Sequence, residues 1–241
     1  MKLYKILVES FEMLKDEPRF FVPRLVSTSI STLWFVLFFE RYMAGLLAQQ
    51  LSNAEIAFYF VSGPLIVFLG VFVSVMLARM VDKGPELKNA FTYTIGALGR
   101  LFKVTSVLMV AGFLVSLPMT AGIVFYPLIG LTGFLMASMV SILLLILTAF
   151  AIYFLPIAIV ESKDLRSSLV NSVRASRKNS WEVSAMLILS IILLALAGIA
   201  QGTIQTLGYI GFALSRLISA VTTTYLFIVS PNMYLGSKSQ V

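Results

Sequence analysis

Neutral polar side chains inside long apolar stretches are the residues of this chain whose type and spacing could bind a solute. Two glutamines lie about one helical turn apart, and three threonines are consecutive. Amides and hydroxyls both donate and accept hydrogen bonds, so such a set can line a polar cavity. Hydroxyls in membrane helices also commonly bond back to their own helix. The candidate cavity residues are Gln201, Gln205, Thr222, Thr223 and Thr224.

A second set of candidates is basic and flanks the apolar stretches. A lysine or arginine near an anionic membrane surface contributes roughly 1 kcal/mol of binding free energy. The same side chains can bind an acidic protein surface. We therefore predict contacts with anionic lipid headgroups or with a partner protein. The candidate contact residues are Arg100, Lys103, Arg166, Arg174, Arg177 and Lys178.

Residue types that support catalysis are missing from the places where an enzyme needs them. The chain contains no Cys and no His, so thiol chemistry, disulfides and imidazole metal ligands are excluded. Its carboxylates lie at the ends of the apolar stretches, and no glycine-rich phosphate loop follows a strand. We predict no catalytic residue, no metal site and no cofactor, and a protein that is not an enzyme.

The apolar stretches themselves predict an integral membrane protein. Hydrophobic residues make up 59% of the 241 residues and charged residues 12%, whereas a soluble domain has about 25% charged residues. A helix needs about 20 apolar residues to cross a bilayer. We therefore predict one all-α membrane domain, residues 1–241, in the cell membrane. Its six predicted transmembrane helices are 20–39, 56–81, 101–124, 134–160, 181–205 and 212–235.

The six predicted spans fall into three copies of one pattern. Each copy starts with an amphipathic helix, which we expect to lie in the membrane interface, and continues with two spans. The second spans begin at residues 56, 134 and 212, a constant step of 78. Two crossings per copy make the repeats parallel, so we predict a rough threefold axis along the membrane normal. The repeats are 1–81, 82–160 and 161–241, and their amphipathic helices are 2–16, 86–100 and 164–178.

One face of each amphipathic helix is marked by apolar residues at helical spacing. In the first copy they are Leu3, Leu7, Phe11 and Leu14. A small hydroxyl residue recurs in register on these helices. The three hydroxyl residues are Ser10, Thr94 and Ser172.

Lysine and arginine are distributed very unevenly between the two sides of the predicted membrane domain. Sixteen of the 18 flank the amphipathic helices or the chain ends, and only Arg41 and Arg216 fall on the opposite side. Basic residues concentrate in cytoplasmic loops, so we predict that both termini are cytoplasmic. The net charge of +7 then lies on the cytoplasmic face, and we predict no nucleic-acid partner.

No ionisable side chain falls near the centre of a predicted span, where a transporter of ions or charged solutes needs one. Arg24, Lys103, Glu182 and Arg216 lie within about two helical turns of a span end. Long side chains in such places can extend to the membrane surface. We also expect Pro156 to bend the fourth span.

Two short segments carry a family resemblance. Asp164–Leu169, followed by Arg177–Trp181 and an apolar span, resembles a segment repeated in a broad group of uncharacterised bacterial and archaeal six-span membrane proteins. That group includes the membrane domain attached to some glycerophosphodiester phosphodiesterases. Lys15–Phe20 resembles the opening element of the same group. The resemblance implies a six-helix membrane fold with interfacial helices and no established activity, without the phosphodiesterase catalytic domain.

Two classes of function remain open from the sequence. The first is a non-enzymatic membrane protein that organises lipid or a partner protein through its basic cytoplasmic face. The second is a permease-like subunit of a multicomponent, ATP-driven transporter. A cavity that reaches Thr222–Thr224 favours transport, whereas a packed, dry helix bundle favours the first class.

Overall fold

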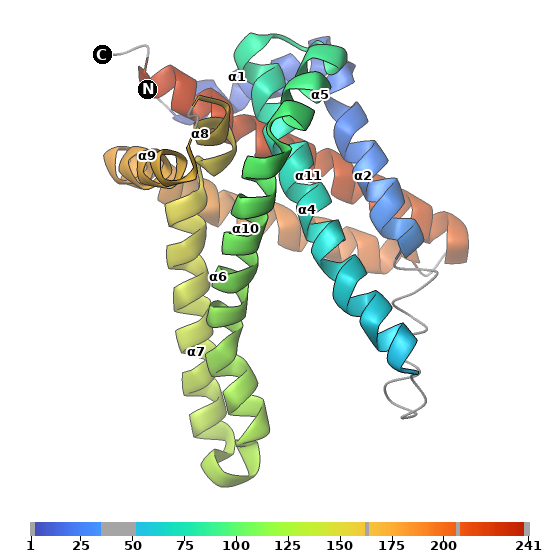
Figure 1. Cartoon of the computed structure of the whole chain (residues 1–241), viewed down its shortest axis with the longest axis vertical. Coiled ribbons are helices and arrows are strands. Elements are labelled where there is room, and N and C mark those ends of the chain that lie inside the picture. The colour runs from blue at the N-terminus through green and yellow to red at the C-terminus, as the bar shows by residue number, and fades with distance from the viewer. Residues whose placement is uncertain (1–2, 35–51, 162–163, 206–207, 239–241) are drawn as a thin grey trace.

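The computed structural model describes residues 3–34, 52–161, 164–205 and 208–238, which are helical almost throughout (Figure 1). The elements are α1 (Leu3–Asp16), η1 (Pro18–Phe20), α2 (Phe21–Trp34), α4 (Asn53–Lys83), α5 (Leu87–Gly96), α6 (Leu98–Val124), α7 (Tyr126–Ile152), α8 (Leu155–Glu161), α9 (Leu165–Lys178), α10 (Ser180–Gln205) and α11 (Gly208–Lys238).

Five segments within the described residues are long and apolar enough to cross a membrane. Their length and composition make this a polytopic membrane protein. The first predicted span, 20–39, is described only as far as Trp34 and so lies partly outside the described residues. The five segments are Val61–Lys83, Leu98–Val124, Tyr126–Glu161, Ser180–Ile204 and Ile210–Ser237.

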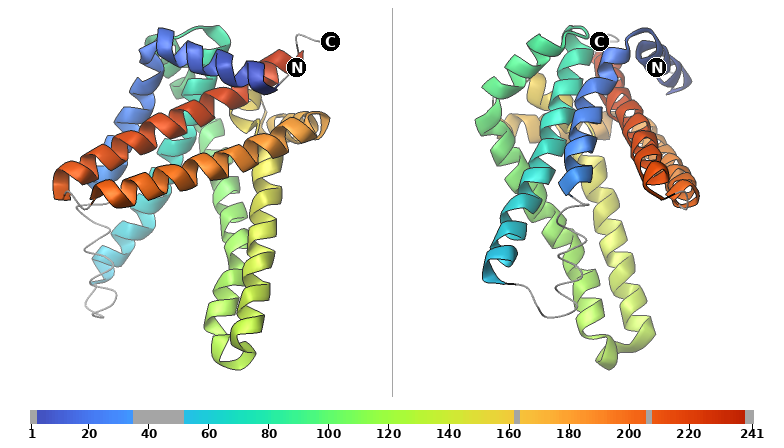
Figure 2. Two further views of the ribbon diagram at one scale, coloured as in Figure 1. Left: turned by 180° about the vertical axis from the view of Figure 1, so that it is seen from behind. Right: turned by 90° about the vertical axis from the view of Figure 1, so that its right-hand side faces the viewer.

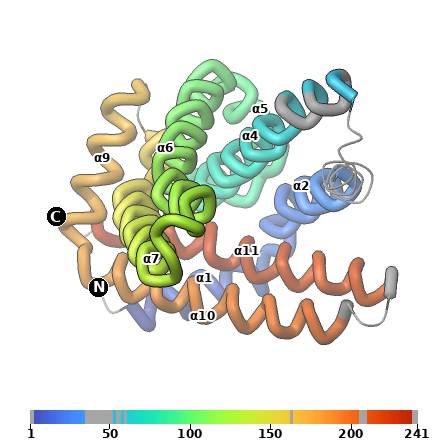
Figure 3. The backbone as a smooth tube through the Cα atoms, turned by 90° about the horizontal axis from the view of Figure 1, so that it is seen from below, coloured from blue at the N-terminus to red at the C-terminus, as the bar shows by residue number. Residues whose placement is uncertain are grey.

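The long helices form pairs that spread apart from one end of the molecule instead of one parallel bundle. The α6–α7 pair and the α10–α11 pair point in clearly different directions (Figures 1 and 2). Seen from below, the α2–α4 side forms a third direction (Figure 3). The shorter helices α1, α5 and α9 gather at the end from which the pairs diverge (Figure 1). The buried core lies at this end, with Ile6, Leu101 and Phe154 among its fully buried side chains.

The connection between α6 and α7 is very short. Phe125 alone separates the two helices, and α7 starts at Tyr126, eight residues before the predicted start of the fourth span. Gly130 then interrupts the helical dihedral angles with φ 63° and ψ −170°, a conformation that glycine adopts without steric cost. On the α6 side of the connection, a Cβ atom on Gly122 would lie 2.9 Å from the Cβ of Ala137 in α7. The absence of a side chain there lets the two helices pack closely.

The fourth predicted span breaks where the sequence predicts a bend. Helix α7 ends at Ile152 and α8 begins at Leu155, with Pro156 as the second residue of α8. Proline is tolerated in a first turn because the amide that it lacks has no helical partner there. The carbonyl groups at the end of α7 do need other partners. Ser172 Oγ donates to the Ala151 carbonyl at 2.8 Å, and Ser230 Oγ donates to the Tyr153 carbonyl at 2.6 Å.

A side chain from the neighbouring helix accepts a hydrogen bond from the backbone beside a second proline, Pro118. Pro118 lies inside α6, and the amide of the following residue, Met119, donates to Ser141 Oγ of α7 at 3.0 Å. Ser141 is buried. Ser138 lies one turn away and only bonds back to the carbonyl of Phe134 in its own helix, at 2.9 Å.

We predict that Ser141→Ala destabilises the α6–α7 pair, because it removes the hydrogen bond that the Met119 amide donates across the two helices. The expected loss of unfolding free energy is about 1 kcal/mol. Unfolding in detergent or bicelles measures it, with Ser138→Ala as the matched control. Equal stability of the two variants would show that the Met119–Ser141 bond does not support the pair.

Candidate functional site

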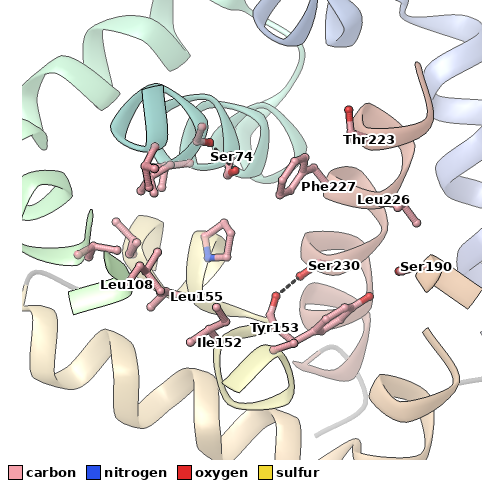
Figure 4. A pocket seen from close by; sticks show the side chains of 18 of the residues that line it. Ser74, Leu108, Ile152, Tyr153, Leu155, Ser190, Thr223, Leu226, Phe227 and Ser230 are labelled. Carbon is pink, nitrogen blue, oxygen red and sulfur yellow. Dashed lines mark hydrogen bonds between the residues drawn. The ribbon is translucent and has the colours of Figure 1, made fainter. Parts of the chain in front are cut away.

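A cavity of about 520 Å³ lies where the helix pairs meet (Figure 4). Side chains from α2, α4, α6, α7, α8, α10 and α11 line it. Most of the wall is apolar, with Leu108, Leu155 and Leu226 among the residues in view (Figure 4). Hydroxyl groups of Ser74 and Ser190 belong to the same wall, although each bonds back to a carbonyl of its own helix.

Arg24 is the charged side chain of this cavity among the described residues that line it. Its Nε donates to Thr223 Oγ1 at 2.9 Å, and its Cζ lies 5.2 Å from the centre of the Phe227 ring. Thr223 Oγ1 donates in turn to the Ser219 carbonyl at 2.6 Å. Within the described residues, no carboxylate lies within 4.0 Å of Arg24.

The inward position of Arg24 differs from the sequence expectation that it would extend to the membrane surface. Its partner Thr223 lies near the middle of α11, and Arg24 itself is half-buried. Position within the span did not predict this, because Arg24 is close to the start of α2. The sequence did contain one signal: Arg24 is followed by an apolar run that contains no acidic residue before Glu40, so no nearby carboxylate in that run can pair with it.

Only one of the four predicted cavity residues whose side chains the structure describes lines this cavity. Thr223 does so, whereas Thr224 is fully buried and donates to the Ala220 carbonyl at 2.7 Å. Thr222 and Gln201 are partly buried and are not lining residues. Gln205 ends α10, and its side chain lies outside the part that the structure describes.

The predicted basic contacts are concentrated on one helix, α9. Its N-terminus is capped by Asp164, whose Oδ2 accepts from the amides of Arg166 and Ser167 at 3.1 and 3.4 Å. The side of α9 that packs on the protein carries the buried serines 168, 172 and 176. The opposite side carries exposed basic residues. They are Arg166, Arg174, Arg177 and Lys178.

A surface groove of about 410 Å³ runs along α9 beside two of these arginines. Its walls are Leu169, Val170 and Val173 together with Arg174 and Arg177. The two guanidinium groups are three residues apart and therefore lie on the same side of the helix. In the described part of the chain, no carboxylate lies within 4.0 Å of any of the four basic residues of α9.

The remaining two predicted basic contacts lie on α6 and differ from each other. Arg100 is half-buried, and its Nη1 donates to the Ile159 carbonyl of α8 at 3.1 Å. This bond holds α6 against the end of α8. Lys103 is exposed. Arg100 is thus engaged within the protein, whereas Lys103 remains accessible to a ligand.

Comparison of this chain with known protein families, with curated proteins and with solved structures gives no match. The resemblance to the six-span group therefore stays a prediction, and function is argued from the two sites alone.

We predict that Thr223→Val destabilises the protein more than Thr222→Val or Thr224→Val. The first change removes the acceptor of a charged donor, and such hydrogen bonds contribute about 1.5–3 kcal/mol. The other two changes remove hydroxyls that contact no charged group among the described residues. Unfolding of the three variants in the same detergent provides the measurement. Equal losses would contradict a stabilising role for the Arg24–Thr223 bond.

Proposed function

We propose that this protein is a non-catalytic, multi-pass membrane protein that binds anionic lipid headgroups of the cytoplasmic leaflet through α9. The observation that supports this function best is the outer side of α9. It carries four exposed basic residues without a described carboxylate partner, and two of them, Arg174 and Arg177, line an apolar groove. A headgroup phosphate can bind two guanidinium groups, while part of an acyl chain lies along Leu169 and Val173.

The proposed orientation places α1, α5 and α9 on the cytoplasmic side. These three helices lie at the same end of the fold, and the α6–α7 turn lies at the far end (Figure 1). The beginning of α1 and the end of α11 lie near one another at the first end (Figure 2). This arrangement supports the orientation predicted from the uneven distribution of lysine and arginine, because the basic residues that flank the spans then share one side.

We further propose that the chain consists of three parallel repeats related by an approximate threefold axis through the cavity. Helix α5 packs on α4, and α9 packs on α7 and α8, so each packs on the second span of the preceding copy. Helix α1 packs on α11 and closes the cycle. The hydroxyl residues in register, Ser10, Thr94 and Ser172, are all fully buried, which supports equivalent roles.

A permease-like subunit of an ATP-driven transporter is the second candidate. The observation in its favour is that the cavity reaches Thr223. We place it second because the wall of the cavity is mostly apolar, and the one charged group among its described lining residues is bonded to Thr223. Co-purification of an ATPase with the untagged protein would favour transport.

The orientation can be measured with single cysteines, because the native chain contains none. We choose Leu128→Cys in the exposed first turn of α7 and Lys88→Cys on α5. A membrane-impermeant maleimide should label Leu128→Cys in intact cells and Lys88→Cys only after permeabilisation. The cysteine-free protein is the control for background labelling. Labelling of Lys88→Cys in intact cells would contradict the proposed orientation.

Lipid binding by α9 can be tested by replacing Arg174, Arg177 and Lys178 with Gln. The protein is reconstituted in vesicles, and the fraction of motionally restricted spin-labelled lipid is compared for anionic and zwitterionic headgroups. The wild type should prefer the anionic lipid, and the triple variant should lose several-fold of that preference, since each basic residue contributes roughly 1 kcal/mol.

The control for this experiment is the double variant Arg174→Lys and Arg177→Lys, which keeps both charges. It should retain most of the preference for anionic lipid. Added salt should weaken that preference both in the wild type and in the double Lys variant. If the triple Gln variant selects lipids as the wild type does, α9 serves only as a topology signal.

A further inference from the structure

We propose that the central cavity is a second, internal lipid site that holds one anionic phospholipid. Its phosphate lies on the guanidinium of Arg24, and one acyl chain lies along the apolar wall. This site is distinct from the surface groove on α9, because none of the residues lining one lines the other.

The first step of the argument is the unmet bonding capacity of Arg24. A guanidinium carries five N–H donors in a fixed plane. Thr223 accepts from Nε, and the Phe227 ring lies against the group. Within the described residues, Arg24 makes no other hydrogen bond and no ion pair. The Nη atoms are therefore left to bind an oxyanion, and their fork matches the spacing of two phosphate oxygens.

The second step is the energetic cost of a cation without a counter-ion. A cation that faces an apolar, membrane-embedded wall without a counter-ion is unfavourable. Thr223 and the Phe227 ring compensate only part of that cost, since both are neutral. An anionic ligand provides the missing charge, and a single negative charge is sufficient for a single arginine.

The third step is the shape and chemistry of the wall, which select a lipid over a small soluble anion. A volume of about 520 Å³ lies within the range of about 300–1,000 Å³ that is typical of ligand pockets. The side chains of Val67, Val71, Leu187 and Leu194 add to its apolar surface. A small anion would leave this surface uncovered, whereas an acyl chain covers it.

The fourth step is the depth of the arginine. Arg24 lies near the start of α2, at the end of the fold where α1, α5 and α9 gather (Figure 1). In the proposed orientation the backbone of Arg24 lies toward the cytoplasmic leaflet, and its side chain extends from there to Thr223, near the middle of α11. A phospholipid whose phosphate is at Arg24 would thus keep its chains within the hydrocarbon.

The cavity can be filled without disturbing the surrounding helices. A Cβ atom on Gly70, a lining residue of α4, meets no atom within 4 Å. We therefore expect Gly70→Leu to occupy space that the acyl chain needs. Gly112→Leu on α6 is the matched control, because that glycine also has no atom within 4 Å of its Cβ and does not line the cavity.

The experiment measures co-purifying lipid. Each full-length variant is reconstituted with equal amounts of anionic and zwitterionic phospholipid, extracted in detergent and washed. Retained lipid per protein is then quantified by mass spectrometry. The wild type should retain one anionic phospholipid. Arg24→Gln should lower retained anionic lipid by about tenfold, since charged hydrogen bonds of this kind contribute about that factor or more. Gly70→Leu should abolish retention of both lipid classes.

Two control variants separate this site from the other effects. Arg19→Gln removes an exposed arginine of η1 at the same end of the chain, and it should retain lipid like the wild type. The triple Gln variant of α9 should also retain the cavity lipid, so failure of the α9 site leaves this inference standing. Full retention in Gly70→Leu overturns the proposal. An unchanged headgroup preference in Arg24→Gln, or recovery of a fatty acid in place of the phospholipid, also overturns it.

Discussion

Backbone carbonyl groups that lose their helical partners inside a membrane must find other hydrogen-bond donors. In this protein that requirement arises where α7 ends and α8 begins, beside the fully buried Phe154. Ser172 from α9 and Ser230 from α11 donate to carbonyls at this break. The break therefore joins the short helix α9 and the long helix α11 to the fourth span. Both candidate sites depend on it, because α9 carries the groove and α11 carries Thr223.

Basic residues serve two different electrostatic roles in this fold. The arginines of α9 are exposed, so water and salt screen each charge. Their electrostatic attraction for an anion depends on several of them lying close together. Arg24 is alone and half-buried, in a setting of lower polarity where one charge has a larger effect. Arg100 has a third, structural role, because it donates to the carbonyl of Ile159 near the end of α8. Counting basic residues in the sequence cannot separate these roles.

The sequence predicted the membrane class, the approximate positions of the five described spans and the three short helices, because each depends on local composition and periodicity. It did not predict which side of a short helix faces the protein. In α1 the predicted apolar face contained Leu14, which is buried, but it also contained Phe11, which is exposed. A helix at a membrane interface has lipid on one side and protein on another, so apolar residues alone do not identify the protein side. The inward position of Arg24 was missed for a similar reason, since it depends on a contact with Thr223 about 200 positions later.

The short connection at Phe125 has a consequence for how the protein enters the membrane. Helices α6 and α7 each contain 27 residues, and no charged residue occurs between Lys103 and Glu161. A hairpin of this kind has no charged loop that must cross the hydrocarbon. Moving charged side chains through the hydrocarbon has a high free-energy cost, which this hairpin avoids. The two helices can therefore insert together as one unit during biosynthesis. The close approach at Gly122 lets them pair before the remaining helices assemble around them.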